Sequence, residues 1–277
     1  MNLPKFEKMP KAIAIDLDGT LLNSRTELSP RNRHALQTCI KKGIPVIIAT
    51  SRPLRIFDRI FPGDLAIGCS LVAMNGAIAK GAAPLSGFYK ELLPREIPRG
   101  IIEIAEKSAP DAHITIEIDG YKFGINWTPE PGTLWSRNAA TLDMVTTIED
   151  ALSQEPCKIA ISRIPIDEIM KQLVKKYGDS ISIIPAIITY PMLNITAINA
   201  SKPVALRRLL QPHHIALEDV LAFGDDYPDL DMLQACGIPV AMDNAFPEIK
   251  TVCRYGTATN DDNGVAIVLE EMLRLLH

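Results

Sequence analysis

Two pairs of aspartates carry the strongest chemical signal in the sequence. Asp16 and Asp18 lie in the segment D-L-D-G-T, Asp225 and Asp226 lie in G-D-D-Y-P-D, and each segment directly follows a short apolar run. Carboxylates gathered in this way repel one another unless a cation is bound, and hard oxygen ligands suit Mg²⁺. Because ligands bind at the carboxyl ends of strands in open α/β sheets, we expect a Mg²⁺ site there.

Hydroxyl and ammonium groups stand at two further element boundaries. Thr50-Ser51-Arg52 follows the apolar run 44–49, and Lys202 begins a predicted helix. Such groups, together with helix N-terminal amides, hold phosphoryl groups in proteins. Each has an ordinary alternative, since a lone Asp after a strand is usually a turn residue and a lone Lys at a helix start is usually solvated. The joint order of all these residues favours phosphoryl chemistry.

Other sites that these motifs could indicate are not supported. The segment D-x-D-G begins like a calcium loop, but Leu21 stands where that loop requires glycine. The chain contains neither G-x-G-x-x-G nor G-x-x-x-x-G-K-[ST], so other nucleotide-binding folds are not indicated. The histidines form no set with ligand spacing, and surface or packing roles fit them better.

The composition excludes several classes of protein. The net charge of the 277 residues is −4, which provides no basic field for nucleic acid or anionic lipid. No stretch approaches the roughly 20 apolar residues of a membrane helix, and the N-terminus lacks the apolar run of a signal peptide. The 5 cysteines include no C-x-x-C pair. We therefore expect a cytoplasmic protein without a disulfide framework or structural zinc.

The pattern of elements predicts an α/β protein with an inserted module. Apolar strands at 11–17, 44–49 and 66–73 alternate with helices, one of which begins at Ser29-Pro30 and ends at Gly43. The alternation of apolar strands and helices returns after residue 202. Between them, a hairpin with a D-G turn at Asp119-Gly120 indicates a different module. We predict a doubly wound parallel-sheet (Rossmann-like) core formed by 1–84 and 196–277, and an α+β cap domain at 85–195.

The remaining elements of this prediction follow the same patterns. In the cap we expect helices near 94–107 and 165–177 and strands at 112–118, 121–125, 157–162, 181–184 and 193–198. In the second half of the core we expect helices at 202–210, 229–235 and 265–276 and strands at 220–223 and 238–242.

At these residues the chain resembles the haloacid dehalogenase (HAD) superfamily, and within it the Cof-type phosphatases. The motifs concerned are D-L-D-G-T-L-L, A-T-S-R-P, M-N-G-A, the lysine of A-S-K-P, G-D-D-Y-P-D-L-D-M-L, A-M-D-N-A-F-P-E-I-K and N-D-D-N-G-V-A. The resemblance implies the HAD fold, with Asp16 as nucleophile and metal ligand. It further implies that Asp18 is the acid/base and a metal ligand through its backbone carbonyl, and that Asp225 binds the metal.

The resemblance also implies which residues bind the phosphate group and which residues surround it. Thr50, Ser51 and Lys202 would bind phosphate. Supporting or substrate contacts would come from a wider set: Gly19, Arg52, Asn75, Gly76, Asp226, Asp229 and Asn244. The chain departs from the family pattern at Ser51 (usually Gly), Pro203 (usually Gly), Pro228 (usually Asn) and Asp243 (usually Gly). The last two departures put substrate contacts and the charge of the metal site in doubt.

The resulting hypothesis is a Mg²⁺-dependent phosphatase that forms an aspartyl-phosphate on Asp16. Its partner would be a small phosphorylated metabolite, which the sequence leaves open among sugar phosphates, nucleotides and phosphorylated cofactors. A phosphomannomutase-like phosphotransferase and a non-catalytic sensor of phosphorylated metabolites are the alternatives. We expect the insert to close the site, with Trp127, Trp135, Arg137 and Asn138 as candidate substrate contacts.

Overall fold

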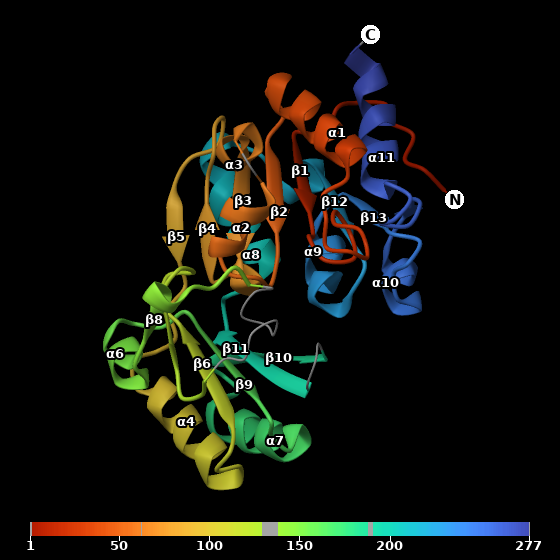
Figure 1. Cartoon of the computed structure of the whole chain (residues 1–277). Helices are drawn as coiled ribbons and strands as arrows, with labels where there is room; N and C mark the ends of the chain where they lie inside the picture. The colour runs from red at the N-terminus through yellow and green to blue at the C-terminus, as the bar shows by residue number, and fades with distance from the viewer. Residues whose placement is uncertain (1, 62, 129–137, 188–190, 277) are drawn as a thin grey trace. The chain divides into compact units, whose positions relative to one another are not determined.

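The computed structural model describes residues 2–61, 63–128, 138–187 and 191–276, and these form two compact units (Figure 1). The core unit comprises Met1–Ser51, Phe57–Tyr89 and Lys202–His277. The insert unit comprises Arg52–Ile56 and Lys90–Ser201. Both ends of the chain therefore contribute to one unit, and the short segment Arg52–Ile56 packs with the other, which the sequence did not indicate.

An eight-stranded sheet forms the centre of the core unit, in the order β14-β13-β12-β1-β2-β3-β4-β5. Its strands are β1 (Ala12–Ile15), β2 (Val46–Ala49), β3 (Cys69–Ala73), β4 (Ile78–Lys80), β5 (Phe88–Lys90), β12 (Val220–Gly224), β13 (Ile238–Ala241) and β14 (Tyr255–Gly256). The strands from β14 to β3 pair in parallel, and β4 pairs antiparallel with β3. The predicted parallel sheet is confirmed.

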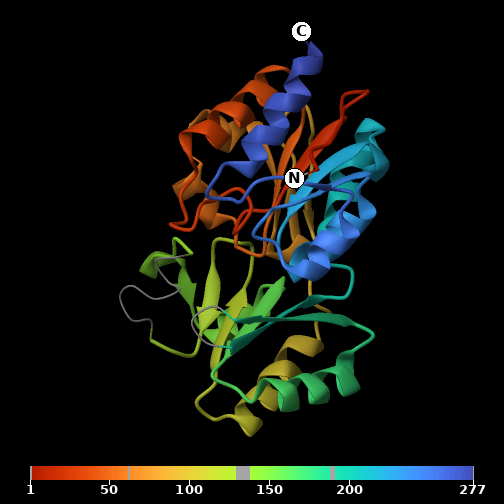
Figure 2. The same ribbon diagram turned by 90° about the vertical axis from the view of Figure 1, so that its right-hand side faces the viewer.

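Helices cover both faces of this sheet, which is why its central strands are apolar on both sides. The helices of this region are α1 (Pro30–Lys41), α2 (Arg55–Ile60), α3 (Asp64–Gly68), α8 (Lys202–Leu210), α9 (Leu230–Ala235), α10 (Pro247–Val252) and α11 (Gly264–Leu273). Helix α1 packs on α3 and α11, while α9 packs on α8 and α10. Figure 2 shows the orange-red α1 and dark-blue α11 on one side of the sheet and the lighter-blue α9 and α10 on the other. Every residue of β1 and β12 is buried, as expected for a doubly wound sheet.

Local sequence explains where the first helix begins and ends. Ser29 is the N-cap of α1, its hydroxyl accepts a hydrogen bond from the amide of Asn32, and Pro30 occupies the first helical position. After the helix, Gly43 adopts a φ of +75°, a conformation that glycine tolerates without strain. The predicted boundaries of this helix are confirmed. The predicted strand at 66–73 is shorter, because its first residues form the end of α3.

A six-stranded sheet forms the insert unit, in the order β10-β11-β9-β6-β7-β8. Its elements are β6 (His113–Glu117), β7 (Phe123–Ile125), β8 (Val145–Thr146), β9 (Lys158–Ser162), β10 (Ile181–Ile187), β11 (Pro191–Ala197), α4 (Ile97–Ser108), α6 (Ile148–Ser153) and α7 (Ile166–Tyr177). All pairs are antiparallel except β7 with β8. The predicted hairpin is present, and the Asp119 carboxylate accepts hydrogen bonds from the amides of Tyr121 and Lys122 in its turn.

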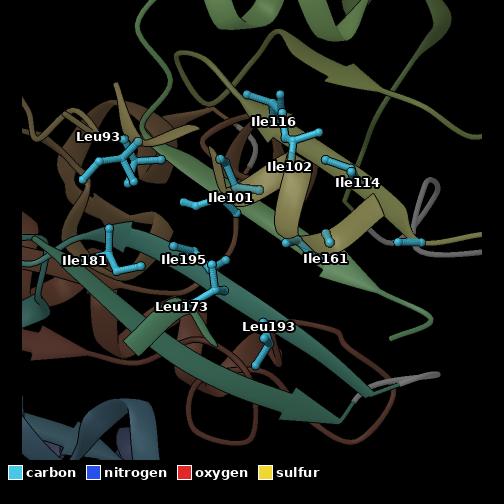
Figure 3. Close-up of a cluster of buried hydrophobic side chains, with 14 of the residues drawn as sticks. Leu93, Ile101, Ile102, Ile114, Ile116, Ile161, Leu173, Ile181, Leu193 and Ile195 are labelled. Carbon is cyan, nitrogen blue, oxygen red and sulfur yellow. The ribbon is translucent and has the colours of Figure 1, made fainter. Parts of the chain in front are cut away.

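The insert unit has its own apolar core between the sheet and two helices. Figure 3 shows side chains of the strands, including Ile114 and Ile161, together with Ile101 of α4 and Leu173 of α7. All of these residues are fully buried. Their spacing in α4 and α7 is the helical pattern that predicted amphipathic helices near 94–107 and 165–177. The fold class, an α/β core with an α+β insert, is confirmed. Within the described parts of the chain, no helix has the length and apolar character needed to cross a membrane.

A buried ionic cluster links Arg55 to the sheet of the insert unit. The Arg55 guanidinium donates two hydrogen bonds of 2.7 Å to the carboxylate of Glu117, and the two side chains are 3% and 8% exposed. Lys158 lies opposite Glu117 on the neighbouring strand, and burial lowers its pKa to about 8 against the opposing attraction of Glu117. Glu117 therefore pairs with one buried cation, Arg55, and lies opposite a second, Lys158.

We expect Glu117→Gln to lower the free energy of unfolding by about 3–5 kcal/mol, because removing one partner leaves buried charge uncompensated. Urea unfolding followed by circular dichroism measures this loss. The matched control is Glu149→Gln, which breaks a similar forked pair with Arg99, at 2.6 Å, whose side chains are 69% and 59% exposed. Exposed pairs contribute about 1 kcal/mol or less, so equal losses in the two variants would contradict the prediction.

Candidate active site

The parallel register brings the predicted chemical groups to one edge of the core sheet. Asp16 follows β1, Thr50 follows β2 and Asp225 follows β12, and β1 lies between the other two strands. Backbone hydrogen bonds fix these ends, since the amide of Asp16 donates to the Phe223 carbonyl at 3.1 Å. Residues that are far apart in sequence therefore meet at adjacent strand ends.

Lys202 is the centre of the contacts at this edge. It is the first residue of α8, and its Nζ donates to Asp16 Oδ1 at 2.6 Å and to Asp229 Oδ1 at 2.5 Å. All three residues are buried, with Lys202 only 3% exposed. Burial disfavours the charge of Lys202, but the two carboxylates outweigh this effect and raise its pKa. The lysine is therefore held as an ammonium against Asp16.

Asp229 ties the second aspartate motif together. Its Oδ2 accepts hydrogen bonds from the backbone amides of Asp225 and Asp226, at 3.0 and 3.2 Å, while its Oδ1 binds Lys202. Asp226 caps the short helix Tyr227–Asp229 through the amide of Tyr227. Pro228 lies in that first turn, where a missing N–H is tolerated. The family resemblance implies only a supporting role for Asp229, whereas the structure makes it a direct partner of Lys202.

Three carboxylates gather closely enough to hold a cation. Single oxygens of Asp16, Asp225 and Asp229 all lie within 4.8 Å of one another. Burial, followed by repulsion from Asp229, raises the pKa of Asp16 well above its usual range, against the attraction of Lys202. Burial likewise raises the pKa of Asp225 to about 7, opposed by a hydrogen bond from Thr20. One ammonium cannot balance three carboxylates, so the donor set fits a divalent metal.

The turn after β1 shapes the other side of this cluster. Gly19 has a φ of +77°, and a Cβ there would lie 2.3 Å from Asp225 Oδ2, so only glycine fits. The Thr20 hydroxyl donates to Asp225 Oδ1 at 2.6 Å, and Asn244 Nδ2 donates to the Gly19 carbonyl at 2.7 Å. Asp18 lies half buried in the same turn. Thr20 was missed as a site residue, although it is the last residue of the D-L-D-G-T motif.

The ends of β2 and β3 are joined by their backbones. The Thr50 amide donates to the Val72 carbonyl, and the Thr50 carbonyl accepts from the Asn75 amide at 3.1 Å. Thr50 is 1% exposed, and Asn75 and Gly76 lie in the turn that follows β3. The chain passes from the core unit to the insert unit between Ser51 and Arg52.

The structure shows the surroundings of two of the residues that depart from the family pattern. The Asp243 side chain is 70% exposed and lies 3.6 Å from Lys250 Nζ, so its charge has a local cationic partner. Pro203 is the second residue of α8, in the first turn, where proline fits. The charge of Asp243 is therefore offset by Lys250 at an exposed position.

The candidate substrate contacts of the insert unit are only partly described. Trp127 stacks on His113 with ring centroids 5.0 Å apart, and its Nε1 donates to the Thr115 hydroxyl at 3.3 Å. Asn138 is half buried. Trp135 and Arg137 lie outside the described residues. Both of these contacts of Trp127 are to residues of β6.

Comparison with known proteins agrees with this arrangement. The sequence profile of the haloacid dehalogenase-like hydrolases matches residues 13–269. Among curated proteins, the chain is 26% identical to the 5-amino-6-(5-phospho-D-ribitylamino)uracil phosphatase YitU of Bacillus subtilis, over 98% of this chain and 100% of the other. It is 28% identical to the phosphatase YwpJ of the same organism, over 95% and 100%.

Solved structures show the same likeness. A haloacid dehalogenase-like hydrolase from Bacteroides thetaiotaomicron superposes with a TM-score of 0.80 at 26% identity, covering 95% of this chain and 99% of the other. The structure of TM0651 from Thermotoga maritima gives a TM-score of 0.77 at 28% identity, with coverage of 95% and 97%. Both comparisons span the core and insert segments.

Proposed function

Because this chain belongs to the haloacid dehalogenase-like hydrolase family, we propose that it hydrolyses a small phosphorylated metabolite with the help of Mg²⁺, through an aspartyl-phosphate on Asp16. It is a phosphatase of the Cof type and acts on phosphorylated substrates. The metal, the covalent intermediate and the class of metabolite are the finer parts of the proposal.

The observation that carries the proposal is the contact of Lys202 with Asp16 inside a cluster of three carboxylates. Lys202 Nζ binds Asp16 Oδ1, which fixes the carboxylate in orientation and leaves its second oxygen outside that hydrogen bond. A held carboxylate is suited to nucleophilic attack, because attack needs a fixed approach line. The ammonium has three protons and gives two to Asp16 and Asp229, so one proton remains for a phosphoryl oxygen.

The other residues of the edge would complete the reaction. Thr50 and Ser51, at the end of β2, would hold the phosphoryl oxygens. Asp18 would protonate the leaving oxygen and then take a proton from the water that cleaves the intermediate. Asp16, Asp225 and the backbone carbonyl of Asp18 would hold Mg²⁺, which offsets the negative charge of the transferring group. Asp229 would keep Lys202 and the Asp225 loop in place.

The insert unit is proposed to act as a cap that selects the substrate. The relatives named above include a phosphatase for a phosphoribityl-aminouracil, which is a phosphorylated small molecule. Sugar phosphates, nucleotides and phosphorylated cofactors are the candidate substrates here. The experiment is a panel of such metabolites with free phosphate as the readout. Transfer of phosphate to a second position would instead indicate a mutase, and binding without turnover would indicate a sensor.

We expect turnover to require a divalent metal, and the affinity for Mg²⁺ to weaken as the pH falls. The pKa of Asp225, raised from 3.8 to about 7, means that below pH 7 its carboxyl must lose a proton before it binds metal. The Mg²⁺ concentration for half-maximal activity should therefore rise about fivefold from pH 7 to pH 6 and change little from pH 8 to pH 9.

Exhaustive chelation, followed by Mg²⁺ or Mn²⁺ addition, should remove and then restore activity, while Ca²⁺ should substitute poorly because of its looser coordination. The thermal shift produced by Mg²⁺ gives a second readout at each pH. Full activity after chelation would contradict the metal assignment. A Mg²⁺ affinity that stays constant between pH 6 and pH 8 would contradict the role of Asp225.

A further inference from the structure

The turn that follows β3 holds an unusual backbone. Met74, Asn75 and Gly76 have φ angles of +51°, +58° and +95° in succession. Residues other than glycine rarely adopt this conformation, and each one costs about 1–3 kcal/mol unless its surroundings hold it in place. All three residues are buried, so the conformation does not come from a loosely held surface loop. Backbone strain of this kind gathers at functional sites.

The side chain of Asn75 adds a second cost at the same position. Asn75 is 3% exposed, and neither its Nδ2 nor its Oδ1 has a hydrogen-bond partner among the described residues. A buried polar atom without a partner costs about 1–3 kcal/mol, and most such atoms in native proteins are paired. Asparagine tolerates the positive φ better than leucine or alanine does, but glycine would adopt it without burying an unpaired amide, so the backbone conformation alone does not explain an amide here.

The position of Asn75 connects both features to the phosphate-binding residues. Its backbone amide donates to the carbonyl of Thr50 at 3.1 Å, at the start of the loop Thr50–Arg52. Helix α8, which begins with Lys202, packs against the turn Met74–Gly76. The turn that holds Asn75 therefore contacts both elements that supply the phosphate ligands of the proposed mechanism, and the buried carboxamide has no hydrogen-bond partner in either of them.

We propose that Asn75 is a positioning residue for phosphate binding, whose buried carboxamide gains its hydrogen-bond partners from the segment Thr50–Ser51 when that segment closes on a phosphoryl group. The inference rests on the proposed function and adds to it a residue that does not touch the reacting atoms. An amide offers both donors and an acceptor, so it can pair with backbone or side-chain groups of a loop that shifts slightly. The energy regained by pairing stabilises the phosphate-bound arrangement over the free one.

The first test variant is Asn75→Gly, because glycine accepts the positive φ and the change removes the side chain with its carboxamide. We expect about a tenfold rise in KM for the best substrate and in the inhibition constant of inorganic phosphate. A tenfold loss of affinity corresponds to the loss of about one hydrogen bond. The turnover number should fall less than about threefold, since the reacting groups are untouched. The thermal shift that Mg²⁺ with inorganic phosphate produces should shrink, while the melting temperature without phosphate changes little.

A second variant guards against a failure of the first to fold. Asn75→Asp keeps the shape and the tolerance for positive φ, but it removes the donors and adds negative charge beside the phosphate loop. Its KM should rise more than that of Asn75→Gly. The control is His214→Gly, a positive-φ position with φ +57° at an exposed site beyond the far end of α8, where neither KM nor the phosphate shift should change.

The outcomes separate this inference from the proposed function. Wild-type protein without phosphatase activity and without a phosphate-induced thermal shift would remove the proposed function, and this inference with it. An active wild type with unchanged KM and phosphate shift in both Asn75 variants would overturn this inference alone. A lower melting temperature with unchanged phosphate affinity would do the same, because it would show that Asn75 serves the fold, for example through a buried water.

Discussion

Asp16→Asn is expected to reduce phosphatase activity to background, a loss of roughly 10⁴–10⁶-fold as for other enzymes that lose their nucleophile. An amide keeps the shape of the side chain but cannot attack phosphorus or form a stable acyl phosphate. The buried position makes the experiment clean, because the hydrogen bond from Lys202 Nζ to Oδ1 can persist with the amide oxygen. Burial, together with repulsion from Asp229 and Asp225, raises the pKa of Asp16, and the substitution removes that repulsion as well.

The measurement combines steady-state activity, intact-mass analysis of acid-quenched enzyme and thermal unfolding. The wild type should show a phosphoryl adduct during turnover, and the variant should show none. Asp219→Asn is the control, because Asp219 pairs with Lys8 and Lys11 directly before the start of β12, at the opposite end of the strand from Asp225. A phosphoryl group found on another residue would overturn the proposed mechanism. An active Asp16→Asn variant would do so as well.

The strand ends could be predicted because the sheet is parallel. Short apolar runs that end at Asp16, Thr50 and Asp225 place those residues at one edge once the strands pair in parallel, and the alternation of strands with helices predicts that pairing. Lys202 could be predicted because Ser201-Lys202-Pro203 begins a helix. The chemistry of this edge therefore depends on local patterns that a single sequence carries.

Pairings between side chains could not be predicted in this way. Asp229 stands four residues after Asp225, and only the folded loop shows that its two oxygens serve Lys202 and the Asp225 amide. The partnership of Arg55 with Glu117 joins a segment after β2 to a strand of the insert unit, and no local pattern relates them. The unpaired carboxamide of Asn75 is likewise a property of tertiary packing. Local sequence indicates which residues lie at the strand ends, but it does not indicate which side chains form hydrogen bonds or ion pairs with one another.

The second large effect is expected from Asp18→Asn. This change leaves Asp16 and the backbone carbonyl of Asp18 in place and removes only the transferable proton. General acid–base catalysis contributes about 10²–10⁴-fold, so the loss should depend on how strongly the leaving group needs a proton. With a sugar alkoxide as the leaving group, the first step should slow by that full factor. With an aryl oxide, which leaves as an anion, the first step should slow much less.

The same variant should also slow the second step, because Asp18 activates the water that cleaves the aspartyl-phosphate. With the aryl substrate, formation would then outpace cleavage, and phosphoryl-enzyme should accumulate on Asp16. Single-turnover kinetics with both substrates, followed by intact-mass analysis of quenched samples, measures the two steps separately. Equal slowing of the first step for both leaving groups would contradict the role of Asp18 as proton donor. Because Asp18 and Asp16 share one turn of the chain, opposite outcomes for the two variants, accumulation in one and absence of adduct in the other, would assign nucleophile and acid/base within a single motif.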